Sequence, residues 1–234
     1  MPARRLQLLT LACLAWLALA DSAGASSAGL VAAYGFDESS GSSVNDVSGS
    51  GNTGFLVTGA TRTSAGKFGG AVVFDGATGL ITIADSPSLD LTSGMTLEAW
   101  VYPTQPPSDW RDIIYKALDL YYLEGASPQN GGAPGTGGTF TSGQLFAASA
   151  LPQNTWSHLA ATYDGTTLRL YLNGTQIGTK AQTGPIHTST APLTIGGDGA
   201  YSQFWGGKID EVRVYNRALS ASEIVSDRDT PVNP

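Results

Sequence analysis

The chain has 234 residues, with 12 Lys and Arg, 19 Asp and Glu, and a formal net charge of -7 at pH 7. This acidic balance argues against binding to nucleic acid or anionic lipid, because both interactions depend on clustered Lys and Arg. The single cysteine, Cys13, lies in an apolar N-terminal segment, so the rest of the chain must be stabilised by a hydrophobic core and not by disulfides.

The N-terminal segment has the pattern of a secretory signal peptide. Arg4 and Arg5 precede the apolar run "LQLLTLACLAWLALA", and small residues follow it. A membrane-spanning helix needs about 20 apolar residues, and this run is shorter. We therefore expect a signal peptide over residues 1–25 and a secreted mature chain without membrane insertion. That mature chain carries 10 basic and 18 acidic residues.

Short runs rich in Val, Ile, Leu, Thr and Tyr follow one another along the chain and are separated by Gly, Asn, Asp, Ser and Pro. This pattern predicts an all-β protein and argues against alternating strands and helices. The expected strands cover residues 30–36, 71–76, 80–85, 96–103, 112–117, 120–124, 156–165, 168–174, 191–197 and 209–216.

Two tight hairpins are expected, at Asp164-Gly165 and Asn173-Gly174, because both dipeptides tolerate positive φ. In the strand between them Leu168, Leu170 and Leu172 alternate with polar residues, which predicts one core face and one wet face. The Gly- and Pro-rich residues 124–143 predict a long loop or a loosely ordered hairpin.

One short helix is predicted near the C-terminus. Ser220 and Glu223 form a capping-box pattern, and Leu219 and Ile224 form a hydrophobic staple around it. Residues 227–234 have the composition of a linker, so we expect the domain to cover residues 26–226 and the tail to lie outside it.

Several phrases, in order, resemble the LamG-like jellyroll domain of the concanavalin A-like lectin/glucanase superfamily. They are "GLVAAYGFDESSG", "VNDVSGSGNTG", "MTLEAWVYP", "NTWSHLAATYDGTTLRLYLNGTQIG", "LTIGG" and "GGKIDEVRVYNRALSASEI". The resemblance implies a two-sheet antiparallel jelly-roll sandwich, a structural calcium, and a role as a binding or adhesion module in secreted multidomain proteins. It implies no particular ligand, because one fold hosts many functions.

Oxygen-bearing side chains in three of these phrases are candidates for the calcium that the resemblance implies. They are Asp37, Asp46, Asn52 and Asp210. Calcium prefers such ligands together with backbone carbonyls. In the alternative, Asp46 caps a loop and Asp37 or Asp210 accepts backbone hydrogen bonds. Strand alternation places Asp210 on the valine face and Glu211 on the solvated face.

Catalysis is not expected. Glucanases with this architecture carry an E-x-D-x-E strand, whereas here Glu98 stands alone and Asp210 and Glu211 are adjacent. His158 and His187 have no acid or serine beside them that suggests a catalytic triad. A glycoside hydrolase remains the third alternative.

Aromatic side chains in segments that look like loops are the candidates for ligand binding, because their flat faces stack on sugar rings or partner side chains. They are Trp110, Tyr121, Tyr122, Tyr201, Phe204 and Trp205. In the alternative they pack in the core, which is the expectation for Trp100 and Trp156. The sequence thus predicts a secreted, non-catalytic module that binds a glycan or, alternatively, an extracellular protein.

Overall fold

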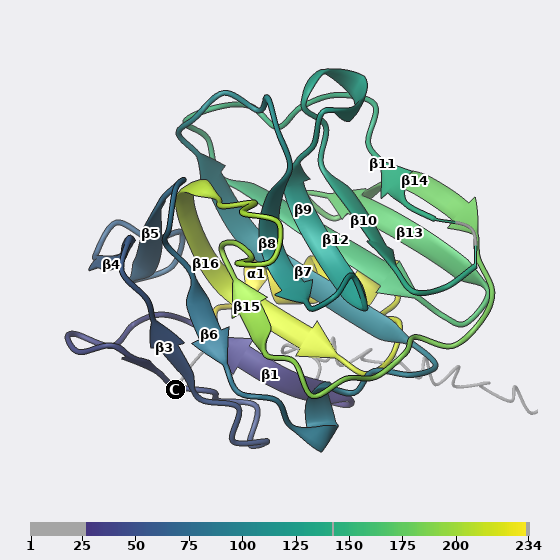
Figure 1. Cartoon of the computed structure of the whole chain (residues 1–234), viewed down its shortest axis with the longest axis horizontal. Helices are drawn as coiled ribbons and strands as arrows, with labels where there is room; N and C mark the ends of the chain where they lie inside the picture. The colour runs from purple at the N-terminus through teal and green to yellow at the C-terminus, as the bar shows by residue number, and fades with distance from the viewer. Residues whose placement is uncertain (1–26, 142, 233–234) are drawn as a thin grey trace, which may run out of the picture.

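The computed structural model describes residues 27–141 and 143–232, and these residues form a sandwich of two antiparallel sheets (Figure 1). The expected signal peptide lies outside the described residues. Sheet A has the strand order β14-β13-β12-β7-β16-β5-β4, with β1 also paired to β16, and sheet B has the order β11-β10-β9-β8-β15-β6-β3-β2. The all-β jelly-roll prediction is therefore confirmed.

The strands of sheet A are β1 (Leu30–Tyr34), β4 (Ala60–Thr63), β5 (Ala71–Asp75), β7 (Met95–Pro103), β12 (Ser157–Tyr163), β13 (Thr167–Leu172), β14 (Thr175–Ala181) and β16 (Gly206–Tyr215). Those of sheet B are β2 (Ser43–Val44), β3 (Gly54–Leu56), β6 (Ile81–Ile83), β8 (Arg111–Lys116), β9 (Tyr121–Ala126), β10 (Gly135–Gly138), β11 (Leu145–Phe146) and β15 (Leu193–Ile195). Short 3-10 turns lie at Pro87–Leu89 and Gln129–Gly131. The described residues thus contain more strands than the ten expected, because short edge strands give little sequence signal.

The core lies between the sheets and is built from alternate residues of each strand. On β7 the inward side chains are Leu97, Ala99 and Val101, all fully buried, and on β13 they are Leu168 and Leu170. Burial of one such aliphatic side chain contributes roughly 1.5–3 kcal/mol. The opposite residues of β7 therefore lie on the outer face of sheet A.

Both predicted hairpin turns are present. Asn173 and Gly174 have φ values of 52° and 80° between β13 and β14, which a tight hairpin turn requires. Gly165 has φ 88° between β12 and β13, where the Asp164 carboxylate accepts the N–H groups of Thr166 and Thr167. In the Gly-rich segment, β9 and β10 pair, so the hairpin interpretation of residues 124–143 is the one observed.

Helix α1 (Ala221–Asp229) covers the outer face of sheet A. Its capping box between Ser220 and Glu223 is formed in both directions, as predicted. Leu219 and Ile224 are buried with Tyr171 and Tyr215 in a small apolar cluster beneath the helix. The helix therefore gives sheet A a third packed layer.

The C-terminal tail packs against the domain as far as Val232. Helix α1 continues through residues 227–229, and Arg213 donates to the carbonyl oxygens of Asp227 and Thr230. Val232 is buried and its N–H donates to the Glu211 carboxylate. The domain boundary expected at residue 226 therefore lies too early, since linker-like composition concealed these contacts.

Within the described ranges, no helix is both long enough and apolar enough to span a membrane.

Candidate functional site

Two of the expected calcium ligands lie in one loop and serve as hydrogen-bonding groups. The Asp46 carboxylate accepts the N–H groups of Ala33, Ser48 and Asn52 at 2.8–3.0 Å. The Asn52 amide nitrogen donates to the Val31 carbonyl at 2.7 Å and to the Ser88 hydroxyl at 2.8 Å. Both side chains thus fasten the loop after β2 to the end of the sandwich.

The other two expected ligands hold the loop of residues 66–70. Asp210 Oδ2 accepts the N–H groups of Lys67 and Phe68 at 2.7 and 3.0 Å. Asp37 Oδ1 accepts the N–H of Gly70 at 2.6 Å. The first and last strands do lie side by side, as expected, because β1 pairs with β16.

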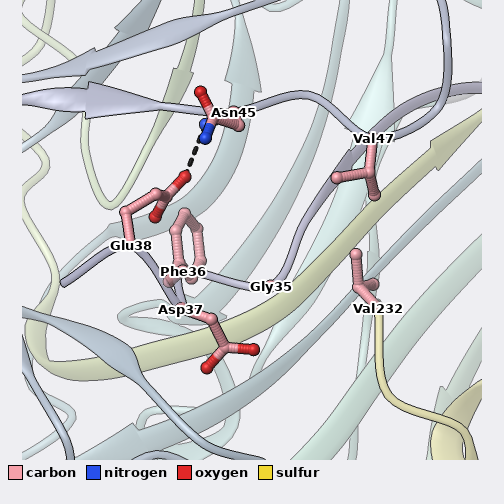
Figure 2. Close-up of a pocket in the computed structure, with 7 residues that line it drawn as sticks. All are labelled: Gly35, Phe36, Asp37, Glu38, Asn45, Val47 and Val232. Carbon is pink, nitrogen blue, oxygen red and sulfur yellow. Dashed lines mark hydrogen bonds between the residues drawn. The ribbon is translucent and has the colours of Figure 1, made fainter. Parts of the chain in front are cut away.

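Asp37 and Glu38 line a hollow of about 220 Å³. Figure 2 shows that their carboxylates point in different directions. Glu38 accepts the N–H of Asn45 at 2.6 Å and pairs with Arg62 at 2.7 Å. These acids are therefore already matched to donors and cations of the protein.

The four predicted residues do not fit calcium. Both carboxylate oxygens of Asp46 and Asp210 and Oδ1 of Asp37 accept N–H groups, whose positive ends would repel a cation, and the Asn52 side chain acts as a donor through its amide nitrogen. A calcium site needs six to eight converging oxygens. Among the residues that the structure describes, no three His, Cys, Asp or Glu side chains group as metal ligands. The geometry supports the alternative in which these residues accept and donate structural hydrogen bonds.

Glu211 is fully buried, so its expected place on a solvated face is wrong. The register between β16 and β7 shifts between Asp210 and Arg213, and Glu211 has φ 56°. This bulge breaks the strand alternation on which the expectation depended. Burial raises the pKa of Asp210 to about 7 and the pKa of Glu211 to about 8.

Glu98, the other candidate acid, lies under α1 on the outer face of sheet A. It is fully buried with His158, and Glu98 Oε2 lies 3.8 Å from His158 Nε2. Burial raises the pKa of Glu98 well above its ordinary value and lowers that of His158 to about 3. His158 is therefore neutral at pH 7, burial favours the protonated form of Glu98, and both groups are out of reach of a substrate.

Two of the six predicted ligand-binding aromatics point into the interior. Tyr121 is 1% exposed and its hydroxyl donates to the Leu89 carbonyl at 2.9 Å. Trp205 is also 1% exposed, and its indole N–H donates to the Lys208 carbonyl. Tyr121 and Tyr122 belong to β9 and not to a loop, and Tyr122, on the outer side of the strand, is nearly buried as well.

Trp110 lies where β8 begins, beside Phe146, and the loop that carries Tyr201 and Phe204 is joined to the same strand. The rings of Trp110 and Phe146 lie 5.8 Å apart at a tilt of 48°, and both are half-buried. Arg111 donates to the carbonyl of Phe204 at 2.7 Å, which fastens the loop between β15 and β16 to β8. Tyr201 in that loop is 51% exposed. We call the surface formed by Trp110 and Phe146, together with the neighbouring loop that carries Tyr201 and Phe204, the aromatic end of sheet B.

Three buried acids lie beside this surface, and the sequence analysis did not single them out. Asp112 on β8 pairs in register with Glu124 on β9, and Asp198 precedes Tyr201 in the loop between β15 and β16. Asp198 accepts the N–H groups of Tyr201 and Gln203. Both carboxyl oxygens of Asp112 and Glu124 Oε2 have no hydrogen-bond partner in the described part of the chain.

Their burial changes how these acids ionise. Burial, then the charge of Glu124, raises the pKa of Asp112 well above its ordinary value. Burial also raises the pKa of Glu124 to about 8. The sequence signal for both was a lone acid inside an apolar strand, in "RDIIYK" and "YYLEGA". Such an acid either needs a partner or marks a site.

A sequence model of the concanavalin A-like lectin/glucanases superfamily matches residues 75–225, and the chain belongs to this family. This agrees with the resemblance noted in the sequence and with the two-sheet fold.

Solved structures share the fold. Domain 4 of AbnA, a GH43 extracellular arabinanase from Geobacillus stearothermophilus, was solved in complex with arabinotriose. It is 22% identical with a TM-score of 0.69, over 86% of this chain and 98% of that one. The binding domain of Paraclostridial mosquitocidal protein 1 is 17% identical with a TM-score of 0.68, over 87% of this chain and 52% of that one. Trypanosoma rangeli sialidase in complex with sialic acid is 18% identical with a TM-score of 0.64, over 88% and 33%.

Pappalysin-1 of Mus musculus is 38% identical over 80 residues, and that of Homo sapiens is 34% identical over 80 residues. The matched segment makes up 32% of this chain and 5% of either pappalysin-1.

Proposed function

We propose that this chain is a secreted, non-catalytic carbohydrate-binding module whose ligand surface is the aromatic end of sheet B. The observation that carries this proposal is the position of the accessible Trp110 and Phe146 rings beside the buried acids Asp112 and Glu124. The family and the fold shared with a domain solved with arabinotriose support it.

The chemistry of this surface suits a neutral sugar. The ring of Trp110 offers an apolar face for the C–H side of a pyranose or furanose, and Tyr201 adds a hydroxyl that can donate or accept. The acids below make the local field negative at alkaline pH, which disfavours anionic sugars there. We therefore expect neutral oligosaccharides at this end of the sandwich.

The burial of the acids supports a non-catalytic role. A retaining glycosidase needs two carboxyl groups about 5–5.5 Å apart that both reach the scissile bond. Asp112 is 1% exposed and Glu124 is 4% exposed, and Glu98 and Glu211 are fully buried. None of these four carboxyl groups is open to a glycosidic oxygen.

The test is a calorimetric titration of the full chain with arabinotriose and with other neutral oligosaccharides. Trp110→Ala is expected to weaken binding at least about tenfold, since stacking on one aromatic ring contributes about 0.5–1.5 kcal/mol beyond its buried area. Trp156→Ala is the matched control, because Trp156 is also half-buried but lies on sheet A beside Tyr102. Equal affinity of the two variants would contradict the proposal.

A protein-binding module is the second candidate. It is favoured by Phe55 on β3 and by Val57 just after it, which are 54% and 40% exposed. Absence of binding to every neutral oligosaccharide in the same titrations would favour this candidate.

A further inference from the structure

A hollow with different chemistry lies on the outer face of sheet A, next to helix α1. Its volume is about 410 Å³, which suits one or two sugar units. The residues that line it are Lys67, Phe68, Trp100, Asn173, Arg228 and Asp229. Nothing in the proposed neutral-glycan surface involves these residues.

Lys67 is the cation at this hollow whose ammonium group forms no ion pair in the described part of the chain. Its Nζ lies 4.1 Å from the centre of the Trp100 ring and 5.6 Å from that of Phe68. Across the described residues, no carboxylate lies within ion-pair distance of this ammonium group, whereas Arg228 is paired with Asp229 at 2.6 Å. An ammonium group that contacts aromatic rings on one side can bind an anion on its other side.

The loop that carries Lys67 is fixed from below. The N–H groups of Lys67 and Phe68 both donate to Asp210 Oδ2, and Gly66 donates to the Gly69 carbonyl. A Cβ at Gly66 would lie 1.8 Å from the Gly70 carbonyl oxygen, so only glycine fits there. Because this backbone is held in place before any ligand arrives, little ordering cost remains for binding.

One other polar group at the hollow also suits a carboxylated sugar, and the carboxylate of Asp229, which lines the hollow too, is paired with Arg228. Asn173 accepts the backbone N–H of His158 through Oδ1, which leaves its amide nitrogen as a donor. The Phe68 ring, edge-to-face to Trp100 at 6.4 Å, adds an apolar wall. The chain as a whole carries a net charge of -7, which disfavours a dense polyanion. A single charge on a ring-shaped ligand matches one open lysine.

We propose that this hollow binds a sugar residue bearing one carboxylate, such as a uronic acid, with Lys67 pairing the carboxylate and Phe68 contacting the ring. The site is separate from the aromatic end of sheet B, so this proposal can be tested independently of the neutral-glycan proposal.

Lys208 provides a matched control on the same face. Its Nζ lies 4.4 Å from the Tyr102 ring and 5.2 Å from the Trp156 ring, much as Lys67 lies on its own rings. In contrast to Lys67, it donates to the Ala65 carbonyl at 2.9 Å. The two lysines therefore differ in whether the ammonium group already donates a hydrogen bond to the protein.

The experiment is a calorimetric titration of the full chain with digalacturonic acid and with the corresponding neutral galactose disaccharide. Lys67→Met is expected to lower the affinity for the acidic disaccharide at least about tenfold, and Lys67→Arg to retain most of it, since only the first removes the charge-assisted pair to the carboxylate. Trp110→Ala should leave it within about twofold, because Trp110 lies at the other sheet. Lys208→Met removes the hydrogen bond to the Ala65 carbonyl beside the loop that carries Lys67, so it should lower the affinity less than Lys67→Met does.

Three outcomes would overturn the proposal. They are equal affinity of the wild type and Lys67→Met, equal loss in Lys67→Met and Lys208→Met, and equal affinity for the acidic and neutral disaccharides. A glutamate-rich peptide that binds through Lys67 more tightly than the sugar acid would assign the hollow to a protein partner and would also overturn it. Failure of the neutral-glycan proposal shows differently, as insensitivity of arabinotriose binding to Trp110→Ala.

Discussion

Asp112 and Glu124 pair in register across β8 and β9, and both are buried beside a third acid, Asp198. The two buried carboxyl groups of Asp112 and Glu124 cannot both be ionised at low cost, because each charge loses its hydration and repels the other. The native protein therefore holds protons that the unfolded chain would release, and this has consequences for stability.

Stability should fall as the pH rises from about 5 to 8. Burial raises the pKa of Glu124 and Glu211 to about 8 and that of Asp210 to about 7, while in the unfolded chain these acids titrate near about 4. Between these values the native state binds more protons than the unfolded state, so the free energy of unfolding decreases with pH. Thermal unfolding at half-unit pH steps checks this, and a midpoint that rises towards pH 8 would contradict it.

Glu124→Gln should raise the unfolding midpoint at pH 8 and change it little at pH 5. The substitution keeps the side-chain shape and removes one of the buried like charges. Glu223→Gln is the contrasting variant. Glu223 pairs with Arg217 at 2.6 Å, and the hydrogen bond from Arg217 and the donors of Ser220 lower its pKa to about 2. Loss of this ion pair should destabilise the protein at both pH 5 and pH 8. Equal effects of the two variants would show that Glu124 is not strained by its neighbours.

Ser220→Ala should cost about 1 kcal/mol of stability, because the N-cap hydroxyl accepts the Glu223 N–H at the start of α1. Urea denaturation measures this cost. The control is Ser222→Ala. Ser222 is exposed and its hydroxyl lies 3.1 Å from that of Ser220, but the Glu223 N–H is bonded to Ser220 and not to Ser222, so stability is expected to change by less than about 0.5 kcal/mol. A cost shared equally by both serines would contradict the importance of the cap.

Asp210→Asn should destabilise the protein by about 1–3 kcal/mol, since one carboxylate oxygen accepts two N–H groups of the loop at residues 66–70. We expect Asp210→Asn to lose the same stability in EDTA and in millimolar calcium, because these hydrogen-bonded side chains do not fit a calcium ion. Calcium that bound only the native state would raise the unfolding midpoint. A calcium-dependent rise in the wild type that Asp210→Asn removes would restore the metal hypothesis.

Much of the fold follows from local patterns in the sequence. The Asn173-Gly174 turn, the alternation of Leu168 and Leu170, and the Ser220 capping box each depend on neighbouring residues alone, and each is observed. These features are set by backbone φ preferences and by the periods of strands and helices, which a single sequence displays directly.

The site depends on relationships that a single sequence does not display. One extra residue in β16 interrupts the strand alternation at Glu211, which is buried against Val232 of the C-terminal tail, and a bulge of this kind leaves no compositional mark. Asp112 and Glu124 meet only because β8 and β9 pair in this register. Trp110 and Phe146 are 36 positions apart in the sequence, and the residues next to either of them give no sign that the two rings are in contact.

The central claim is that the aromatic end of sheet B binds a neutral glycan, and a nuclear magnetic resonance titration of the labelled chain with arabinotriose tests it most directly. We predict amide shift changes confined to the neighbourhood of Trp110, Glu124, Phe146 and Tyr201, with saturation and with loss of the changes in Trp110→Ala. Saturable shift changes centred on Lys67, or on the exposed Phe55, with none at Trp110 would contradict the account.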